Sequence, residues 1–315
     1  MTDAQLVLGR LGAGPIGSGA VVLDEKKARA AIETKVAKPL GIPVEAAAAG
    51  IIRLLEQKLL HAVERISIER GYDPRRFTLV AGGGAGALHG ASVGRIIGCR
   101  TVYVPRLAGA FCALGMLHSN LRQDYMQVVY PTLLDGKSHD HCAPQFAELE
   151  RKAQFALQQE GFGREEIQIR RQLDLRYRGQ QWSLRIDLGD DGRADTSVVR
   201  KDFENEYRRQ FGHIQPDGAI EITALRVAGI GPLPPLRPTV RTNGVALPEP
   251  IEVRDVYLDD GQGRVPAKVY NGRALVPGHK LQGPLIVKEA TTTLLVGAGD
   301  RLEVDGTDNF VIHLA

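Results

Sequence analysis

A strand that runs through closely spaced glycines into a helix is the feature that most constrains how this chain can fold. The stretch is Phe77–Gly90 (FTLVAGGGAGALHG), in which apolar residues are followed by Gly82, Gly83, Gly84 and Gly86. Glycine has no Cβ, so its backbone can approach a ligand closely, and the helix N-terminus presents unpaired N–H groups to oxygen atoms. The pattern therefore predicts a nucleotide site at this turn, without saying which nucleotide binds.

The composition of the 315 residues is that of a soluble globular protein, long enough for two domains or three small ones. Its 40 basic and 37 acidic residues are too balanced to indicate a nucleic-acid partner. The three cysteines, Cys99, Cys112 and Cys142, form no CxxC pair, which favours a reducing compartment. No signal peptide or membrane-length apolar run is present, so the sequence predicts a cytoplasmic protein without a membrane partner.

The first part of the chain alternates predicted helices and strands, which is an α/β pattern with a right-handed crossover. The long helix beginning after Pro43 carries apolar residues on more than one stripe, so we expect most of it to be buried against a sheet. We also expect the last helix, rich in small residues, to pack closely on a neighbour. The predicted elements are helices 25–38 and 44–70, strand 77–80, helix 85–97, strand 101–104 and helix 107–118.

The rest of the chain changes character, and we predict domain boundaries at 1–130, a linker at 131–142, an α+β unit at 143–240 and a β-rich module at 241–315. Alternating apolar residues at 171–177 and 182–188 predict a hairpin with one buried face, followed by helix 197–211 and strand 220–227. After residue 249, short alternating runs separated by Gly, Asp and Pro predict a small all-β module.

The glycine stretch also fits the dinucleotide template G-x-G-x-x-G/A through Gly82, Gly84 and Ala87. That template expects an acid about twenty residues further on, at the end of the next strand, to hold the ribose. Here strand 101–104 is followed by Arg106 with no acid nearby, which argues against NAD. Two alternatives stay open: an NADP site using Arg106, and glycines that only let the helix pack on the strand.

Three further residue patterns have simpler structural explanations. Gly90–Gly94 matches G-x-S-x-G, but Ser92 falls about two turns into the predicted helix rather than at a strand-to-helix elbow. His139–Cys142 (HDHC) offers metal-ligand types, yet adjacent residues cannot easily reach one tetrahedral ion and no second cluster completes the set, so we expect a solvated loop and no metal site. A histidine such as His89, just after a glycine turn, is more often structural than catalytic.

Several stretches, in order along the whole chain, resemble the A subunit of the ATP-dependent hydantoinase/oxoprolinase family, whose relatives include acetone and acetophenone carboxylase subunits. The matching stretches are Thr2–Leu11 (TDAQLVLGRL), Glu69–Arg75 (ERGYDPR) running into Phe77–His89, Phe111–His118 (FCALGMLH) with Leu121–Tyr125 (LRQDY), Asp174–Gln180 (DLRYRGQ) and Leu275–Ile286 (LVPGHKLQGPLI).

The resemblance implies an α/β lobe of an actin/Hsp70/sugar-kinase-like ATPase fold at the N-terminal end. It implies ATP with Mg²⁺ as the cofactor, with the backbone at Gly82, Gly83, Gly84 and Gly86 against the adenosine, and no metal ligands in this chain. Ala85, His89 and Asp3 are the weaker candidates near the nucleotide or substrate. The implied reaction is opening of a cyclic amide such as hydantoin or 5-oxoproline, in which ATP activates the carbonyl. A related ketone carboxylation is the alternative.

The sequence departs from that family in one respect. The family carries two Asp-x-Gly-Gly-Thr/Ser phosphate loops upstream of the TDA segment, and neither occurs in these 315 residues. Without them the chain lacks a cradle for the β- and γ-phosphates and a carboxylate for Mg²⁺, so we do not expect it to turn over ATP alone. A split subunit, a specialised accessory subunit and a gene product that starts late all remain open as explanations.

We therefore expect the adenosine-binding half of a larger enzyme, with no catalytic residue identified. The expected partners are a B-type hydantoinase/oxoprolinase subunit and a chain that carries the phosphate loops. A non-catalytic interaction subunit, in which the glycines are purely structural, is the competing class.

Overall fold

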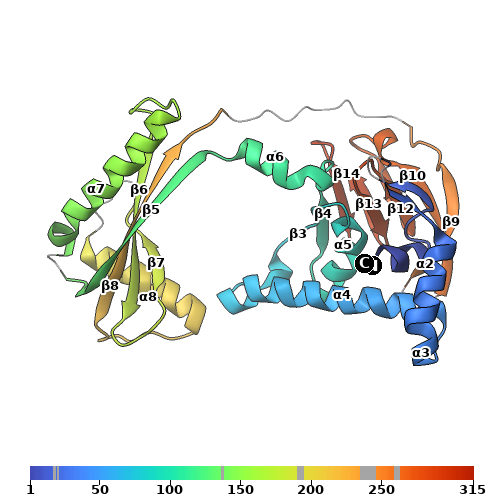
Figure 1. The fold of residues 1–315 in the computed structure, drawn as a ribbon, viewed down its shortest axis with the longest axis horizontal. Helices are drawn as coiled ribbons and strands as arrows, with labels where there is room; N and C mark the ends of the chain where they lie inside the picture. Colours follow the sequence, from blue (N-terminus) through green and yellow to red (C-terminus); the bar gives the residue numbers. More distant parts are fainter. Residues whose placement is uncertain (17–18, 20, 136–137, 190–194, 235–245, 259–262) are drawn as a thin grey trace. The chain divides into compact units, whose positions relative to one another are not determined.

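The computed structural model describes residues 1–16, 19, 21–135, 138–189, 195–234, 246–258 and 263–315. The chain divides into two compact units (Figure 1). Unit 1 combines Met1–Leu117 with Arg237–Ala315, and unit 2 consists of His118–Leu236. In the described part of the chain, no helix is both long enough and apolar enough to cross a lipid bilayer.

Helices form the N-terminal part of unit 1, broadly as predicted. The Asp24 side chain caps the first predicted helix by accepting from the Lys27 N–H at 3.1 Å. The second predicted helix ends at Ile66 rather than at residue 70, and a 3-10 turn follows before Gly71 takes up a left-handed conformation. The elements are α1 (Thr2–Val7), α2 (Glu25–Ile32), the π-helical turn η1 (Glu33–Ala37), α3 (Lys38–Leu40), α4 (Val44–Ile66) and the 3-10 turns η2 (Ile68–Arg70) and η3 (Pro74–Arg76).

The expectation that most of α4 would be buried is wrong for this chain. Its buried residues are confined to the first half, where Ala47–Ala49 and Ile52 pack against α1 and α2 and Glu56 follows one turn later. By contrast, the side chain of Leu54 is 69% exposed and that of Ile66 is 63% exposed. The apolar pattern identified a helix; in its second half Leu60 and Val63 pack, half-buried, against Val93, Ile97 and Cys99, while other apolar side chains such as Ile66 stay exposed.

The glycine stretch lies at the edge of a five-stranded sheet with the order β11-β14-β15-β4-β3. Strand β3 (Leu79–Val80) is shorter than predicted and runs parallel to β4 (Thr101–Val104), with α5 (Gly86–Ile97) connecting the two (Figure 1). This confirms the predicted strand–helix–strand order. The remaining strands come from the far end of the chain, and β15 (Phe310–His313) pairs antiparallel with β4.

That pairing corrects the prediction of a separate β module at 241–315. Strands β11 (Lys280–Gln282), β14 (Arg301–Val304) and β15 extend the sheet of the first lobe, so both chain regions share one core. A second, four-stranded sheet with the order β13-β12-β10-β9 completes this part of the unit. Its strands are β9 (Glu252–Leu258), β10 (Gly263–Asn271), β12 (Leu285–Lys288) and β13 (Thr293–Val296), and the turn η5 (Gly272–Ala274) follows β10. Strands β1 (Gly14–Ile16) and β2 (Val21–Leu23) form a separate two-stranded ribbon.

The predicted small-residue helix at 107–118 consists of the turn η4 (Ala108–Ala110) and α6 (Phe111–His118). It does not pack as expected, because α6 buries none of its side chains against the described part of the chain. Met116 is 75% exposed and Leu117 is 64% exposed. The preceding turn does pack closely, because Ala108 is fully buried and a Cβ on Gly109 would lie 2.4 Å from Thr291 Oγ1. The expectation of close packing therefore holds for η4 and not for α6.

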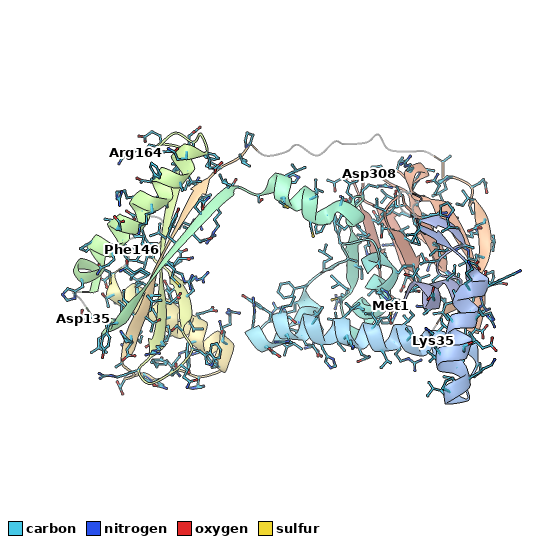
Figure 2. All side chains as sticks on the ribbon, in the orientation of Figure 1. Met1, Lys35, Asp135, Phe146, Arg164 and Asp308 are labelled. Carbon is cyan, nitrogen blue, oxygen red and sulfur yellow. The ribbon has the colours of Figure 1, made fainter. Side chains whose placement is uncertain are left out.

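Unit 2 is the predicted α+β unit, an antiparallel sheet with the order β5-β8-β6-β7 and two helices on one face. The elements are β5 (Leu121–Leu133), α7 (Ser138–Gln159), β6 (Gln168–Tyr177), β7 (Leu184–Asp187), α8 (Thr196–Phe211) and β8 (Ile220–Gly231). The predicted hairpin is confirmed by the pairing of Leu173 with Ile186, although Trp182 lies before β7 and is 84% exposed. Phe146 on α7, labelled in Figure 2, belongs to the core beneath the helices. Phe203 on α8 belongs to the same core.

The predicted linker at 131–142 is also a correction. Strand β5 continues to Leu133 because its ladder with β8 resumes at Thr132 after an irregularity. Helix α7 then begins at Ser138 and contains Pro144 in its second turn. The polar and proline residues that suggested a linker therefore lie at a strand end and a helix start, and the boundary between the units falls earlier, after Leu117.

Candidate functional site

The glycine loop, residues 81–85, connects the end of β3 to the start of α5 and is held at both sides by hydrogen bonds to its backbone. The Ala81 N–H donates to the Tyr103 carbonyl at 2.8 Å, and the Gly83 N–H donates to the Ala108 carbonyl at 2.6 Å. On the other side, the Thr292 hydroxyl donates to the Gly84 carbonyl at 3.1 Å. The loop thus has a fixed shape although it contains almost no side chains.

The exposed part of this loop is backbone. Gly83, Gly84 and Ala85 are exposed, and Gly82 and Gly86 are half-buried. The N-terminus of the twelve-residue helix α5 has no side-chain cap among the described residues. The Leu88 N–H donates to the Ala85 carbonyl, and the N–H groups of Gly86 and Ala87 before it can serve a ligand oxygen. These five predicted residues therefore lie together as one accessible backbone surface.

The glycines of the loop exclude larger residues for different steric reasons. Gly83 has a φ of +87°, which L side chains rarely adopt, and no described atom lies within 4 Å of the position its Cβ would take. A Cβ on Gly82 would meet the Phe111 ring at 3.0 Å, and a Cβ on Gly84 would meet the Thr291 carbonyl oxygen at 3.3 Å. The loop can therefore pass between its neighbours only as glycine.

A second row of glycines along α5 serves packing. A Cβ on Gly90 would lie 3.0 Å from Val102 Cγ1, and one on Gly94 would lie 2.8 Å from Val102 Cγ2 and 3.0 Å from Leu314 Cδ1. These two residues let α5 lie close against the sheet. The alternative that glycines only let the helix pack on the strand therefore accounts for Gly90 and Gly94. It does not account for Gly83 and Gly84, which are exposed.

The structure places His89 in a buried set of hydrogen-bonding side chains rather than on the exposed surface of the loop. His89 is 5% exposed; its Nδ1 lies 3.0 Å from Glu56 Oε1 on α4, and its Nε2 lies 3.3 Å from Gln5 Nε2 on α1. The Ser92 hydroxyl donates to Glu56 Oε2 at 2.6 Å. Ser92 thus lies within α5, as the sequence predicted, and its hydroxyl bonds a carboxylate.

No sequence pattern drew attention to Glu56 or Gln5, although both connect α1, α4 and α5. The one available signal was an acid placed four residues after Ile52, on the side of α4 that is otherwise apolar. Asp3 is exposed in the first turn of α1, two residues before Gln5. His89 and Asp3 are therefore linked through α1, but His89 itself cannot touch a ligand at the loop surface without moving.

Arg106 has a structural role that rules out the NADP alternative. Its five guanidinium N–H groups donate to the carbonyls of Gly272, Leu275 and Asp308 and to the carboxylates of Glu289 and Asp308. The guanidinium carbon also lies 4.2 Å from the centroid of the Phe310 ring. Since no N–H group of this side chain is left over, it cannot bind a ribose phosphate.

Metal-ligand residues do not cluster in the described part of the chain, where no group of three or more His, Cys, Asp or Glu could hold an ion. The side chains of His139 and Asp140 lie outside the described residues. Of the two others in that motif, His141 is exposed and Cys142 is buried in the core of unit 2, where burial raises the pKa of its thiol. The motif lies at the start of α7 instead of in the expected solvated loop.

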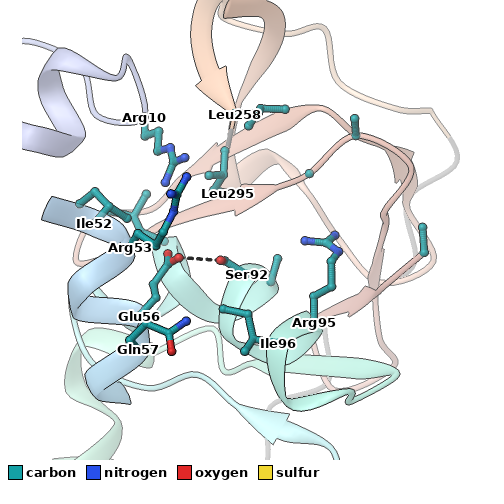
Figure 3. A pocket seen from close by; sticks show the side chains of 15 residues that line it. Arg10, Ile52, Arg53, Glu56, Gln57, Ser92, Arg95, Ile96, Leu258 and Leu295 are labelled. Atoms are coloured by element: carbon teal, nitrogen blue, oxygen red, sulfur yellow. Dashed lines mark hydrogen bonds between the residues drawn. The ribbon is translucent and has the colours of Figure 1, made fainter. Parts of the chain in front are cut away.

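A cavity of about 530 Å³ lies beside α5 on the side that faces α4, within unit 1 (Figure 3). Side chains of α4, α5 and the second sheet line it, including Arg10, Arg53 and Arg95. Ser92 and Glu56, which bond each other, form part of its wall. None of the sequence patterns identified this cavity, because its residues come from six separate stretches of the chain.

Comparisons with known proteins cover nearly the whole chain. Residues 1–125 match the hydantoinase/oxoprolinase family model, and residues 137–315 match the hydantoinase/oxoprolinase C-terminal domain. The chain is 33% identical to the caprolactamase subunit alpha of Pseudomonas jessenii, over 97% of this chain and 45% of that protein. It is 26% identical to the acetone carboxylase beta subunit of Xanthobacter autotrophicus, over 97% of this chain and 44% of that protein.

A solved structure agrees with these relatives. The crystal structure of the ATP-dependent caprolactamase from Pseudomonas jessenii matches 99% of this chain and 46% of its own, with a TM-score of 0.85 and 31% identity. The chain therefore spans about half the length of the relatives that it matches. The family models together cover both units, and the chain belongs to the hydantoinase/oxoprolinase family.

Proposed function

We propose that this chain supplies the adenosine-binding side of an ATP-dependent enzyme that opens a cyclic amide. The observation that carries the proposal is the glycine loop, whose exposed backbone is held by Thr292 and Ala108 and leads into the uncapped N-terminus of α5. A flat base and ribose can lie against a surface without side chains, while the N–H groups of a helix N-terminus favour ligand oxygens. The named activity of the caprolactamase relative supports ATP as the nucleotide.

The residues present fit the adenosine end of ATP and not its phosphate end. Gly82, Gly83, Gly84 and Gly86, with Ala85, would contact the adenosine through their backbone, and His89 would act indirectly by holding α5 against α1 and α4. ATP would supply the phosphoryl group that activates the amide carbonyl. The described residues offer no cluster of carboxylates for Mg²⁺, so the metal and the phosphates would be held by phosphate loops outside these 315 residues.

We infer that unit 1 is a lobe of the actin, Hsp70 and sugar-kinase type. The parallel pair β3 and β4, joined through α5 and extended by antiparallel strands, supports this, because the ligand loop then lies at the carboxyl end of a parallel strand. In such an arrangement a second lobe carries the phosphate loops and faces the glycine loop. The exposed apolar residues of α4 and α6 are consistent with a covering element of that kind.

The partner of this chain would then be a B-type subunit, together with a region that carries the phosphate loops. Both relatives named above are described as subunits, which supports a multi-subunit enzyme. Cyclic-amide hydrolysis is favoured over ketone carboxylation because the identity to the caprolactamase subunit is 33%, against 26% for the acetone carboxylase subunit. Cytoplasmic location is part of the same proposal.

The proposal is tested by measuring nucleotide binding to the full chain by isothermal titration calorimetry. We expect adenosine and ATP to bind with similar micromolar affinity, because the phosphate loops are not part of this chain. Gly84→Val should abolish binding, since its side chain would be forced against the Thr291 carbonyl and into the adenosine surface. Gly115→Ala in α6, where no described atom lies within 4 Å of the Cβ position, is the matched control and should bind normally.

Binding of NADP alone, or binding that survives Gly84→Val unchanged, would overturn the nucleotide assignment. If no adenine nucleotide binds, the result favours the non-catalytic interaction subunit. The reaction itself is tested by combining the chain with a B-type subunit and a polypeptide that carries the phosphate loops, and by measuring ADP release. Release that depends on a lactam or hydantoin supports the cyclic-amide assignment, whereas release that depends on a ketone with bicarbonate supports the carboxylase.

A further inference from the structure

One large aromatic side chain of unit 2 lies outside the core. Trp182, the only tryptophan of the chain, is 84% exposed in the turn between β6 and β7. Its side chain makes no hydrogen bond and no ring contact within the described part of the chain. Single exposed apolar residues are common on protein surfaces, so the residues beside this one decide whether it has a function.

Trp182 lines a pocket of about 310 Å³ that lies within unit 2 and is formed by α8, β6, β7 and the turn between those strands. Helix α8 contributes an aromatic row at every fourth residue: Phe203 is fully buried, Tyr207 is 5% exposed and Phe211 is 50% exposed. The ring centroids of Tyr207 and Phe211 are 4.5 Å apart. The row therefore leads from the core of unit 2 to its surface, and Trp182 adds an aromatic face from a different segment.

Hydrogen bonds hold the turn that carries Trp182. Before it, the Gln180 N–H donates to the Tyr177 carbonyl at 3.1 Å. After it, the Ser183 hydroxyl lies 2.9 Å from the hydroxyl of Thr223 on β8. This side of the pocket is thus formed before any ligand arrives, which reduces the entropy lost on binding.

Two polar groups of the pocket leave complementary hydrogen-bonding capacity side by side. Gln180 Nε2 donates to the Tyr207 hydroxyl oxygen at 2.7 Å. Among the described residues, Gln180 Oε1 accepts no hydrogen bond and the Tyr207 hydroxyl hydrogen has no acceptor. What remains is one donor on Tyr207 next to one acceptor on Gln180. The adjacent C=O and N–H groups of a cyclic amide match this pair, because the carbonyl can accept from the hydroxyl while the N–H donates to the Gln180 oxygen.

The charge and size of the pocket restrict the ligand further. Arg176, the one charged residue among the described side chains that line it, already donates through Nε and Nη2 to Glu221 at 3.2 Å. The pocket therefore gives no reason to select an anion. Its volume is at the small end of the range for ligand sites, which suits a single ring. Aromatic walls favour a flat unsaturated ring over a puckered one, because flat rings can stack.

We propose that this pocket binds a neutral, planar ring with an amide edge, of the pyrimidinedione or pyridone kind. The ring lies against Trp182 and Phe211, its carbonyl accepts from Tyr207 and its N–H donates to Gln180. The site belongs to unit 2 and does not depend on the nucleotide site proposed for unit 1, so either can fail without the other. It gives unit 2 a ligand-binding role of its own.

The test uses uracil as the probe and follows the fluorescence of Trp182 in the full chain, excited where uracil does not absorb. We expect a saturable shift of the emission maximum with a dissociation constant of about 1 mM, as suits a ligand with few atoms. Dimethyluracil, methylated on both ring nitrogens, should bind at least about tenfold more weakly because it leaves Gln180 Oε1 without a partner. Dihydrouracil, which keeps the amide groups but not the flat ring, should bind about fivefold more weakly.

Gln180→Met is the variant that tests the amide recognition, since it keeps the side-chain length and removes the acceptor. It should weaken uracil binding to the level of dimethyluracil and leave dimethyluracil binding nearly unchanged, so the roughly tenfold preference between the two disappears. A substitution that only loosened the pocket would weaken both ligands alike. Gln158→Met, at an exposed position of α7 outside the pocket, is the matched control and should keep the preference. Far-ultraviolet circular dichroism and the midpoint of thermal unfolding verify that each variant is folded.

Several results would overturn the proposal. A loss of fluorescence that rises linearly with uracil and never saturates is collision with an exposed indole, and it counts against a site, as does no response up to about 10 mM. Equal binding of uracil and dimethyluracil, or a preference that survives Gln180→Met, contradicts the amide recognition. Equal binding of dihydrouracil contradicts the need for a flat ring.

Trp182→Ala gives a separate check, with saturation-transfer NMR of the uracil protons in place of fluorescence. Uracil binding should weaken at least about tenfold, because the ring loses an aromatic face. Unchanged binding would mean that uracil binds elsewhere on the chain, and the proposed pocket would be wrong.

Discussion

Glu56 of α4 and His89 of α5 lie side by side in the interior of unit 1, with Glu56 Oε1 3.0 Å from His89 Nδ1. With the Nδ1–H group donating to Glu56, Nε2 is the acceptor for the Gln5 amide, whose nitrogen lies 3.3 Å away. Gln5 Oε1 then has no partner among the described residues. These side chains connect three helices behind the glycine loop, so their loss should affect stability and loop geometry together.

Glu56→Gln should lower the free energy of unfolding by roughly 2 kcal/mol, because a buried carboxylate that accepts from Ser92 and His89 becomes an amide with only one acceptor oxygen. The measurement is urea unfolding of the full chain followed by circular dichroism. Glu69→Gln, in the exposed turn η2, is the control and should change stability by less than about 0.5 kcal/mol. Equal effects of the two substitutions would show that the buried set contributes nothing.

The glycine row on α5 gives a second prediction. Gly94→Val should lower the free energy of unfolding by about 2 kcal/mol or more, since its Cβ would lie 2.8 Å from Val102 Cγ2 in a packed core. Gly50→Ala in α4, where no described atom lies within 4 Å, should instead raise it by roughly 0.5–1 kcal/mol through helix propensity. Opposite shifts in the midpoint of thermal unfolding distinguish a packing glycine from a replaceable one; a neutral Gly94→Val would contradict the close approach.

The local elements of this fold could be predicted from the sequence because they depend on short-range patterns. The helix start at Asp24, the alternation along β6 and β7 and the strand–glycine–helix order around residues 77–97 are all visible within a dozen residues. The same holds for the exposed glycine backbone, which follows from residue type. The family resemblance of the chain, stated from its motifs, is likewise confirmed by the matching family models.

Features that depend on distant parts of the chain could not be predicted. The pairing of β4 with β15 joins residues about two hundred positions apart, and periodicity says nothing about which strands become neighbours. His89 meets Gln5 and Glu56, which lie 84 and 33 residues away, so its buried position could not be inferred from the loop. The apolar surface of α4 likewise showed that a covering element was needed without showing whether this chain contains it.

Arg106→Lys should destabilise unit 1 by about 3 kcal/mol, because an ammonium group has three donors on one atom and cannot reach the carbonyls and carboxylates that the guanidinium joins. The affected carboxylates, Glu289 and Asp308, are largely buried. Arg100→Lys, an exposed arginine nearby in sequence, is the matched control and should leave the urea midpoint unchanged. Equal unfolding of the two variants would mean that the contacts of Arg106 do not stabilise the fold. The argument that these contacts keep Arg106 from binding a ribose phosphate would then fail.

Glu45 at the start of α4 predicts a dependence of stability on pH. The side-chain hydrogen bond from Arg29 at 2.8 Å holds the pKa of Glu45 below its ordinary value of 4.5, although partial burial opposes this. Because the folded-state pKa is lowered, the stabilisation is fully present above the unfolded value and is lost as the pH falls through the folded pKa. Glu45→Gln should therefore lower the free energy of unfolding by roughly 0.5–1 kcal/mol at pH 7, as for a partly exposed ion pair, and by progressively less below about pH 4.5.

Urea unfolding at several pH values gives the comparison, with Glu249→Gln, an exposed position, as the control that should show no such trend. A difference that stays constant down to about pH 3 would mean that the effect of the substitution is steric and that the Arg29 ion pair does not stabilise the fold.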